Sequence, residues 1–163
     1  MPRRDLIVNY LLWYNVLSLG IWVGGTLFQM LVVVPLWSDS PPESVHAFWA
    51  GTQYYSTIHH FFGPLTQVLR VVPLLALVVV AWPNAELRTW IVICAATMVF
   101  GFIFTRAYVY PMNDVLFAKA GEGLDADAVR SLVSRWVFAD RLRFAVMTGG
   151  YLSLLRAFRL PLG

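Results

Sequence analysis

Residues 71–100 read VVPLLALVVVAWPNAELRTWIVICAATMVF, two apolar runs joined by the short polar turn PNAELR at 83–88. Each run belongs to a longer apolar window, about 58–82 before the turn and 90–110 after it. About 20 helical residues cross a hydrocarbon core of about 30 Å, so both windows are long enough to span a membrane. This stretch therefore predicts two membrane-spanning helices joined by a tight turn.

Two further apolar windows flank this pair, at about 6–34 and 137–158. The composition fits a membrane protein, because 59% of the 163 residues are hydrophobic and only 13% are charged. An ordinary soluble domain has about 25% charged residues. We therefore predict an all-α integral membrane protein with a single domain, residues 1–163, in which four transmembrane helices form an up-down-up-down bundle in contact with the lipid bilayer.

The distribution of Lys and Arg predicts the orientation of this bundle. With four spans, the two ends of the chain and the 83–89 turn lie on one side of the membrane, and the first loop, near 35–57, on the other side has no Lys or Arg. Short cytoplasmic segments are rich in these residues, so we expect both termini to be cytoplasmic and the membrane to be the bacterial inner membrane. The same rule explains the net charge of +3, which therefore does not indicate a nucleic-acid partner. The arginines on the predicted cytoplasmic side are Arg3, Arg4, Arg88, Arg156 and Arg159.

Each window carries a polar face. His46, Gln53, His60 and Gln67 follow one another in steps of seven, with Arg70 one turn beyond, and residues seven apart share one side of a helix. Polar groups that faced lipid would have no partner, so we expect the four faces to converge on a polar pocket that opens toward the outer leaflet. The other faces carry Trp22 and Gln29, then Arg106, Tyr110 and Asn113, and finally Trp136, Asp140 and Arg143.

These residues predict a base beside cations. His60 is the candidate base, and Asp140 is expected at a similar depth, where it could orient the imidazole. Arg143 and Arg106 could stabilise an anion in a low-dielectric pocket. In the alternative reading, Asp140 only neutralises one of these arginines as a buried ion pair. The expected substrate-binding residues are Asn113, Trp136, Tyr110, Gln67, Arg70, Gln29 and Trp22.

The histidines do not form a metal motif. Adjacent residues of a helix, such as His59 and His60, point about 100° apart, and His46 and His60 would lie about 21 Å apart in a continuous helix. We therefore predict no metal site. A haem or a metal held at His60 is the alternative.

Three stretches together resemble the DUF1772 family of small four-helix membrane proteins. They are GIWVGGTLF at 20–28, YPMN at 110–113 and RWVFADRLR at 135–143. The P-x-N motif of the family matches residues 111–113, and its later Trp and Arg match Trp136 and Arg143. Asp140 departs from the family pattern, in which a neutral Asn or His is expected more often.

The family includes the anthrone oxygenases of polyketide pathways, so the resemblance implies oxidation of a hydrophobic, anthrone-like aromatic molecule to a quinone by O₂. Removal of a ring proton gives an electron-rich enolate that can react with O₂ without a cofactor. His60 or Asp140 would take the proton, Arg143 and Arg106 would hold the oxyanion, and Asn113 would bind a ring oxygen. The competing interpretation is a non-enzymatic lipid- or quinone-binding protein, a homo-oligomer or an accessory subunit of a larger membrane complex, whose polar faces serve assembly.

Overall fold

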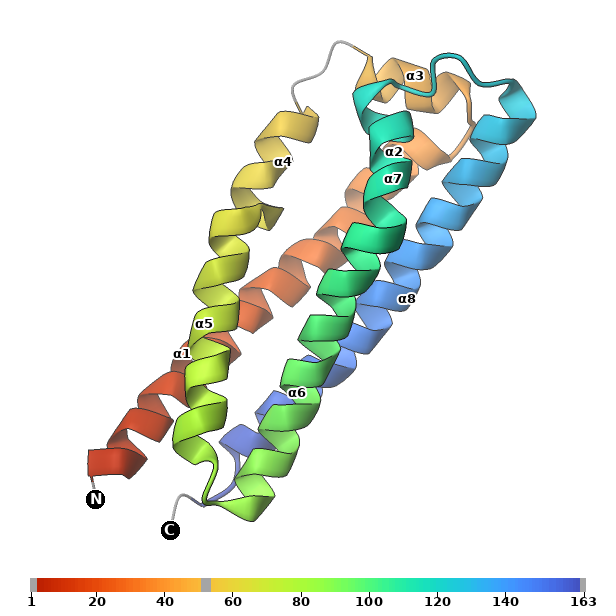
Figure 1. Ribbon diagram of the computed structural model, residues 1–163. Coiled ribbons are helices and arrows are strands. Elements are labelled where there is room, and N and C mark those ends of the chain that lie inside the picture. Colours follow the sequence, from red (N-terminus) through yellow and green to blue (C-terminus); the bar gives the residue numbers. More distant parts are fainter. Residues whose placement is uncertain (1–2, 51–53, 162–163) are drawn as a thin grey trace.

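The computed structural model describes residues 3–50 and 54–161, and within these ranges the chain is all-helical, as predicted, with no strand. Several of the elements follow one another without a break, so that α1 to α2 form one rod and α6 to η3 form another (Figure 1). The elements, with η marking π-helical turns, are α1 (Arg3–Phe28), η1 (Gln29–Val33), α2 (Val34–Ser38), α3 (Glu43–Trp49), α4 (Tyr54–Phe62), α5 (Pro64–Ala81), α6 (Ala85–Phe104), η2 (Thr105–Val109), α7 (Tyr110–Asn113), η3 (Asp114–Ala118) and α8 (Ala126–Phe158).

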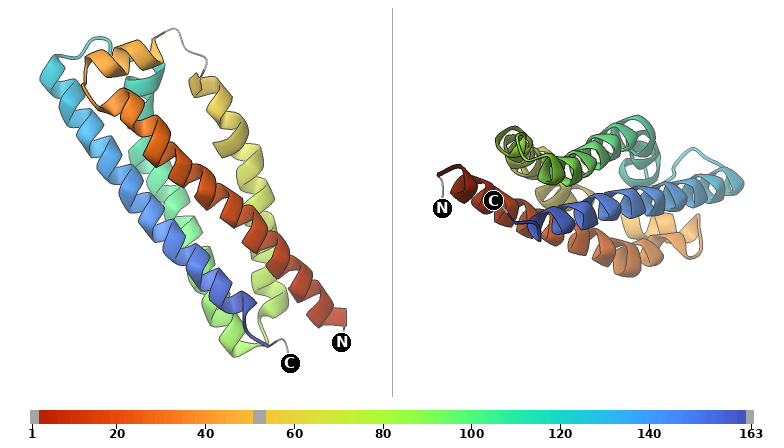
Figure 2. Two further views of the ribbon diagram at one scale, coloured as in Figure 1. Left: turned by 180° about the vertical axis from the view of Figure 1, so that it is seen from behind. Right: turned by 90° about the horizontal axis from the view of Figure 1, so that it is seen from below.

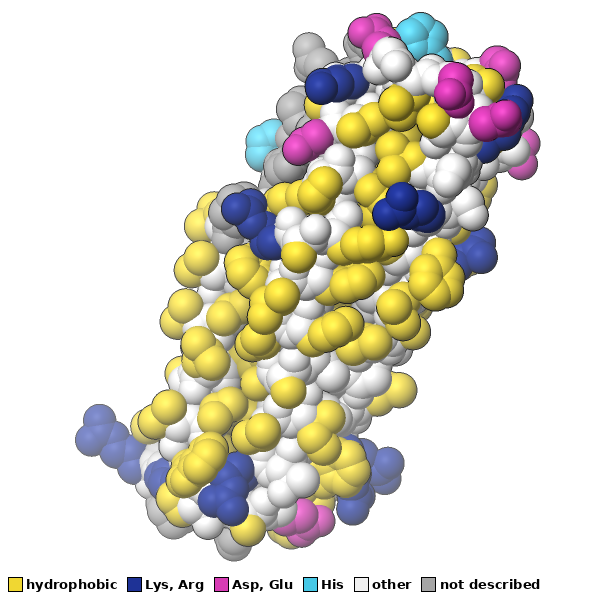
Figure 3. Space-filling model, turned by 45° about the vertical axis from the view of Figure 1, so that its right-hand side comes forward, with side chains coloured by type: hydrophobic (Ala, Val, Ile, Leu, Met, Phe, Trp, Pro, Cys, Tyr) yellow, Lys and Arg dark blue, Asp and Glu magenta, His cyan; other side chains and the backbone are white. Residues whose placement is uncertain are grey.

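Among the described residues, three helical segments are long and apolar enough to cross a membrane: Arg3–Ser38, His60–Ala81 and Ala85–Ala118. They contain the first and third predicted spans and all but the ends of the second, 58–82. The fourth predicted span, 137–158, lies within α8, a helix of 33 residues that carries several charged side chains near its middle. A membrane crossing by α8 stays a prediction. Figure 3 shows hydrophobic side chains over the middle of the molecule, while acidic side chains lie towards its ends.

The helices pack along stripes of buried residues spaced alternately by four and three. This spacing places one residue per turn on the same side of a helix and is typical of helices that pack side by side. As a result α8 lies along both α6 and α1, and α5 lies along α1 and α6 (Figure 2). In α1 the stripe is Val8, Leu12, Asn15, Leu19, Trp22 and Thr26, and in α6 it is Leu87, Ile91, Cys94, Met98 and Gly101.

The buried residues form two separate apolar clusters. The terminal cluster, which includes Leu12, Leu77, Ile91 and Leu154, lies at the end of the bundle where α1 begins and α8 ends (Figure 1). The second cluster lies at the opposite end of the bundle. It contains four large rings, Trp37, Trp49, Phe117 and Trp136, and we call these four rings the aromatic cluster.

Two of the four rings of the aromatic cluster, Trp37 and Trp49, come from the segment that we expected to be a loop, near 35–57. Trp37 of α2 is completely buried, and its ring meets Phe117 edge-on at 5.2 Å and Trp136 at 4.9 Å between centroids. Trp49 of α3 stacks on Phe117 at 4.1 Å. The end of the bundle at which we expected an open pocket is therefore filled by side chains of α2, α3 and η3.

Gly149 and Gly150 provide a matched test of the packing between α6 and α8. A methyl group at Gly150 would overlap Thr97 Oγ1 of α6, whereas one at Gly149 would meet nothing within 4 Å. We expect Gly150→Ala to lower the unfolding temperature, because overpacking costs about 1–3 kcal/mol. Gly149→Ala should leave it unchanged or raise it, since alanine favours a helix by about 1 kcal/mol over glycine. Thermal unfolding in detergent, followed by circular dichroism, measures both variants, and equal unfolding temperatures would contradict the close approach.

Candidate functional site

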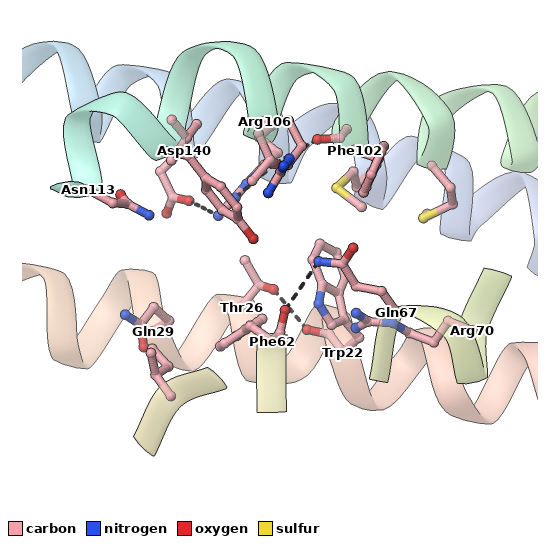
Figure 4. Close-up of a pocket in the computed structure, with 18 of the residues that line it drawn as sticks. Trp22, Thr26, Gln29, Phe62, Gln67, Arg70, Phe102, Arg106, Asn113 and Asp140 are labelled. Carbon is pink, nitrogen blue, oxygen red and sulfur yellow. Dashed lines mark hydrogen bonds and ion pairs between the residues drawn. The ribbon is translucent and has the colours of Figure 1, made fainter. Parts of the chain in front are cut away.

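A cavity of about 160 Å³ lies between the terminal cluster and the aromatic cluster. Its wall contains residues of every long helix, and Leu19 and Leu74 at one end belong to the terminal cluster, while Trp49 and Phe117 at the other belong to the second one. Figure 4 shows the polar side chains gathered in it. The sequence-predicted site residues that line it are Trp22, Gln29, Gln67, Arg70, Arg106, Tyr110, Asn113, Trp136, Asp140 and Arg143.

The cavity approaches the surface at the side of the bundle. Its wall residues on α1 and α8, such as Trp22 and Asp140, are buried. On α5 and α6, by contrast, Val71 is 41% and Phe102 is 53% exposed, and the neighbouring Arg106 of η2 is also exposed. The most exposed of these wall residues therefore lie on the side shared by α5 and α6, which both belong to segments long enough to span a membrane.

An ion pair between Asp140 and Arg143 lies at one end of the cavity. The two side chains are 3% and 17% exposed and stand one turn apart on α8. Arg143 Nη2 donates to Asp140 Oδ1, and Arg143 Nη1 donates to Thr105 Oγ1 at 3.1 Å. Thr105 Oγ1 in turn donates to the carbonyl oxygen of Gly101 at 2.6 Å. The guanidinium is therefore fixed by both α8 and η2.

Two atoms of this ion pair remain unsatisfied. Asp140 Oδ2 and Arg143 Nε are buried and have no hydrogen-bond partner among the residues that the structure describes. A buried polar atom without a partner costs about 1–3 kcal/mol, and such atoms are rare in folded proteins. The pair therefore has capacity for a further polar group that enters the cavity.

Asn113 is held in one orientation by Trp136. The indole Nε1 donates to Asn113 Oδ1 at 2.6 Å, and an indole N–H can only donate. The amide oxygen of Asn113 must therefore face Trp136, which leaves its NH₂ group as the donor toward the cavity. Trp136 is itself fixed, because it packs edge-on against Trp37 and Phe117 in the aromatic cluster.

Two other arginines lie against aromatic rings. The guanidinium carbon of Arg106 is 5.3 Å from the ring centroid of Tyr110, and that of Arg70 is 5.0 Å from the ring centroid of Trp22. Figure 4 shows Gln67 and Arg70 beside Trp22 at one end, with Asp140 and Asn113 at the other. The cavity therefore has cationic groups along its whole length.

The π-helical turn η2 explains why several of these residues face inward. Buried positions in α6 alternate by four and three up to Gly101, but the next buried position in step, Val109, comes eight residues later rather than seven. The extra residue is the mark of a π-turn, which is common at functional sites. Pro111 follows directly, and a proline removes one helical hydrogen bond and displaces the preceding turn. The shift turns Arg106, Tyr110 and Asn113 toward the cavity.

His60 is the predicted site residue that the structure does not bring to the cavity. It lies near the end of α4, is exposed, and is not part of the cavity wall. The prediction assumed one continuous helix from His60 to Gln67, but Gly63 has extended backbone angles, φ −77° and ψ −176°, and α5 begins anew at Pro64. His60 and Asp140 therefore do not share the cavity.

Among the described members of the predicted heptad, Gln67 alone lines the cavity. His46 lies in α3 and is exposed, and Gln53 lies outside the described residues. Within the described part of the chain, no three side chains of His, Cys, Asp or Glu gather closely enough to hold a metal ion.

Sequence reasoning missed the role of Thr105. It stands four residues after Gly101, and its hydroxyl accepts a hydrogen bond from Arg143. The signal that could have found it is its position beside Arg106, at the depth where the fourth helix carries its charged residues. Thr26 of α1 also lines the cavity, but its hydroxyl donates to the carbonyl oxygen of Trp22 at 2.9 Å.

Comparison with known proteins gives one match. The family described as anthrone oxygenase matches residues 49–153, from the end of α3 to near the end of α8. No curated protein and no solved structure matches the chain. The matched region contains the Asp140–Arg143 pair, Asn113, Trp136 and Arg106, and it covers well over half of the sequence. The chain therefore belongs to the anthrone oxygenase family.

Proposed function

We propose that the protein is an oxidoreductase that uses O₂ to convert a ring CH₂ group of an anthrone-like aromatic substrate into a carbonyl group. The observation that carries this proposal is a buried carboxylate oxygen, Asp140 Oδ2, with no partner in an aromatic-lined cavity and with Arg143 beside it. Membership of the anthrone oxygenase family supports the reaction class.

The reaction balances without a further reductant. Removal of one proton from the ring CH₂ leaves an anion that is delocalised onto the ring oxygen. Its carbon adds O₂, and protonation gives a hydroperoxide at that carbon. Loss of water from the hydroperoxide leaves the carbonyl group. The sum is CH₂ + O₂ → C=O + H₂O, in which the substrate supplies all four electrons and one oxygen atom enters the product.

Asp140 is the base in this proposal. Its Oδ2 is buried and unpartnered, whereas His60 is exposed and lies outside the cavity wall. Proton transfer moves one negative charge from Asp140 to the ring oxygen. If that oxygen lies beside Arg143, the same guanidinium balances the charge before and after the transfer. Such preorganised stabilisation is strong in a site from which water is excluded.

Asn113 positions the substrate. Because Trp136 holds its amide oxygen, its NH₂ group points to the cavity and donates to a ring oxygen. Arg106 adds a second positive charge near this oxygen, and the rings of Tyr110 and Trp136 supply flat surfaces for an aromatic substrate.

The proposed membrane arrangement has four spans, up-down-up-down, with both termini in the cytoplasm. The start of α1 and the end of α8 lie at the same end of the bundle (Figure 1), which supports it. The arginines of the short segments at that end, such as Arg4, Arg88 and Arg159, favour the cytoplasmic side.

Reporter fusions in a bacterial host test this arrangement. Green fluorescent protein fused to the C-terminus should fluoresce, because it matures in the cytoplasm. Alkaline phosphatase fused after Glu122, between η3 and α8, should be active because that segment is expected to face the periplasm. Activity of neither reporter would overturn the orientation, because both sites would then lie on the opposite sides from those proposed. Activity of only one reporter would place both sites on the same side of the membrane and would overturn the crossing by α8.

Substitution of Arg143 tests the proposed chemistry. We expect Arg143→Gln to lower kcat by about 100-fold or more, the usual effect of removing one oxyanion-stabilising donor. The measurement is O₂ consumption and quinone absorbance with anthrone as substrate. Arg141→Gln is the matched control, since Arg141 is an exposed arginine two residues away on the same helix. Unchanged turnover in a folded Arg143→Gln protein would overturn this mechanism.

A second variant guards against loss of folding. Removing Arg143 leaves Asp140 buried without its counterion, which costs about 3–5 kcal/mol. Asp140→Asn has almost the same shape and removes the base, and it leaves Arg143 as the unpaired charge, which is the more exposed member of the pair and keeps its hydrogen bond to Thr105. We expect it to abolish turnover as well, and full activity would rule Asp140 out as the base.

Trp136→Phe tests the orientation of Asn113. This change keeps a ring in the aromatic cluster but removes the hydrogen bond to Asn113 Oδ1, so we expect kcat/KM to fall about tenfold, the equivalent of about 1.4 kcal/mol for one hydrogen bond. Trp37→Phe is the control, because Trp37 lies in the same cluster and its Nε1 has no hydrogen-bond partner among the described residues. Equal losses in the two variants would mean that Trp136 contributes only packing.

A further inference from the structure

The charges that line the cavity do not balance. Among the described residues of its wall, three arginines, Arg70, Arg106 and Arg143, face one acidic residue, Asp140. Asp140 is paired with Arg143, and the ion pairs of the described residues include neither Arg70 nor Arg106. Arg106 is exposed and can reach the surface. Arg70 is therefore the cation whose position needs an explanation.

Arg70 lies deep in its helix and on the packed side of it. It is half-buried, and it stands eleven residues before Ala81, the last residue of α5, or about 16 Å along the axis. Gln67, Arg70, Leu74 and Leu77 follow the alternating spacing of a buried stripe, whereas Leu69 and Val72 on other sides are exposed. An arginine at such depth costs about 2.5–3.5 kcal/mol even on the gentler insertion scale.

The contact with Trp22 does not satisfy Arg70. A cation over an aromatic face keeps its charge, and a guanidinium has five N–H donors in its plane. No hydrogen bond joins Arg70 to another described residue. Trp22 is itself buried, with 7% of its surface exposed. The ring therefore holds the guanidinium in place while its donors remain available to a ligand.

We propose that Arg70, with Gln67 and Trp22, binds a carboxylate group on the aromatic ligand of this cavity. The planar fork of a guanidinium matches the two oxygens of a carboxylate, and the face of Trp22 suits the ring that carries it. Gln67 donates to the carbonyl oxygen of Phe62 at 3.2 Å, which fixes its amide at the edge of this subsite. The inference rests on the proposed function and adds the substrate class, a carboxylated polycyclic aromatic.

The length of the cavity fits a ligand of several fused rings. Along α1 its wall extends from Leu19 to Gln29, ten residues or about 15 Å. Arg70 and Gln67 lie at one end, and Asp140 and Asn113 at the other (Figure 4). A rigid ligand anchored by its carboxylate at Arg70 would therefore present a distant ring position to Asp140. Arg70 would hold the molecule while the ring position beside Asp140 reacts.

Binding of a matched pair of probes tests this subsite. The probes are anthraquinone-2-carboxylate and its neutral carboxamide, titrated into the purified full-length protein in a non-ionic detergent and followed by quenching of tryptophan fluorescence. The wild-type protein should bind the carboxylate at least tenfold more tightly than the amide. Arg70→Gln should remove this preference and leave the affinity for the amide unchanged.

Arg88→Gln is the matched control. Arg88 also lies over a tryptophan, Trp82, at 4.9 Å from the ring centroid, but it lies in the first turn of α6 and is not part of the cavity wall. This variant should keep the full preference for the carboxylate. Arg70→Lys retains the charge without the planar fork, so it should keep only part of the preference, and it provides a test if Arg70→Gln does not fold.

Several outcomes would overturn the inference. A preference that survives in Arg70→Gln would place the carboxylate at another arginine. Equal affinity of the wild-type protein for the two probes would also overturn it, yet turnover of neutral anthrone would still support the proposed function. Phosphatidylglycerol is titrated in the same way. If it quenches the fluorescence of the wild-type protein but not of Arg70→Gln, while the two probes bind equally, the subsite binds a lipid headgroup instead. Binding of neither probe would overturn the inference together with the proposed substrate class.

Discussion

The ion pair between Asp140 and Arg143 sets the main constraint on this structure, because charged groups inside an apolar bundle must find their partners within the protein. α8 supplies both members of the pair, and η2 supplies Thr105 as a further acceptor for the guanidinium. The terminal cluster and the aromatic cluster lie on either side of the cavity that contains this pair. The polar cavity therefore exists because two well-packed apolar regions hold the helices at a fixed separation between them.

The π-turns and prolines give the bundle its local irregularity. η1 is followed by Pro35 and η2 by Pro111, each at the second position after the π-turn. An added residue in a helix changes which side chains face inward beyond it. The continuous helix from α6 to η3 thus presents small and apolar residues to α8 along α6, and polar residues to the cavity from η2 onwards. A straight helix with one unbroken heptad pattern could not place both sets on the side that faces its neighbours.

Much of this arrangement can be predicted from the sequence, because hydrophobic length and helical spacing are local properties. The apolar windows predicted the long helices, and the spacing of Arg106, Tyr110 and Asn113, or of Trp136, Asp140 and Arg143, predicted that each set shares one wall. His60 is not part of the cavity wall, because the break at Gly63 ends the helical phase that relates His60 to Gln67. The closure of one end by α2 and α3 also could not be predicted, since it depends on contacts of Trp37 and Trp49 with rings that lie far away in the sequence.

The exposed positions of Val71 and Phe102 have a consequence for enzymology. The segments that contain α5 and α6 are long and apolar enough to cross a membrane, and in that setting a cavity whose wall reaches the surface on their side would meet the hydrocarbon phase before it meets water. An apolar aromatic compound dissolves in that phase, so the relevant concentration is its mole fraction in the membrane rather than its molarity in the buffer. At a fixed total amount of substrate, added lipid or detergent then acts as a diluent, and an apparent KM expressed in bulk units rises in proportion to the volume of the apolar phase.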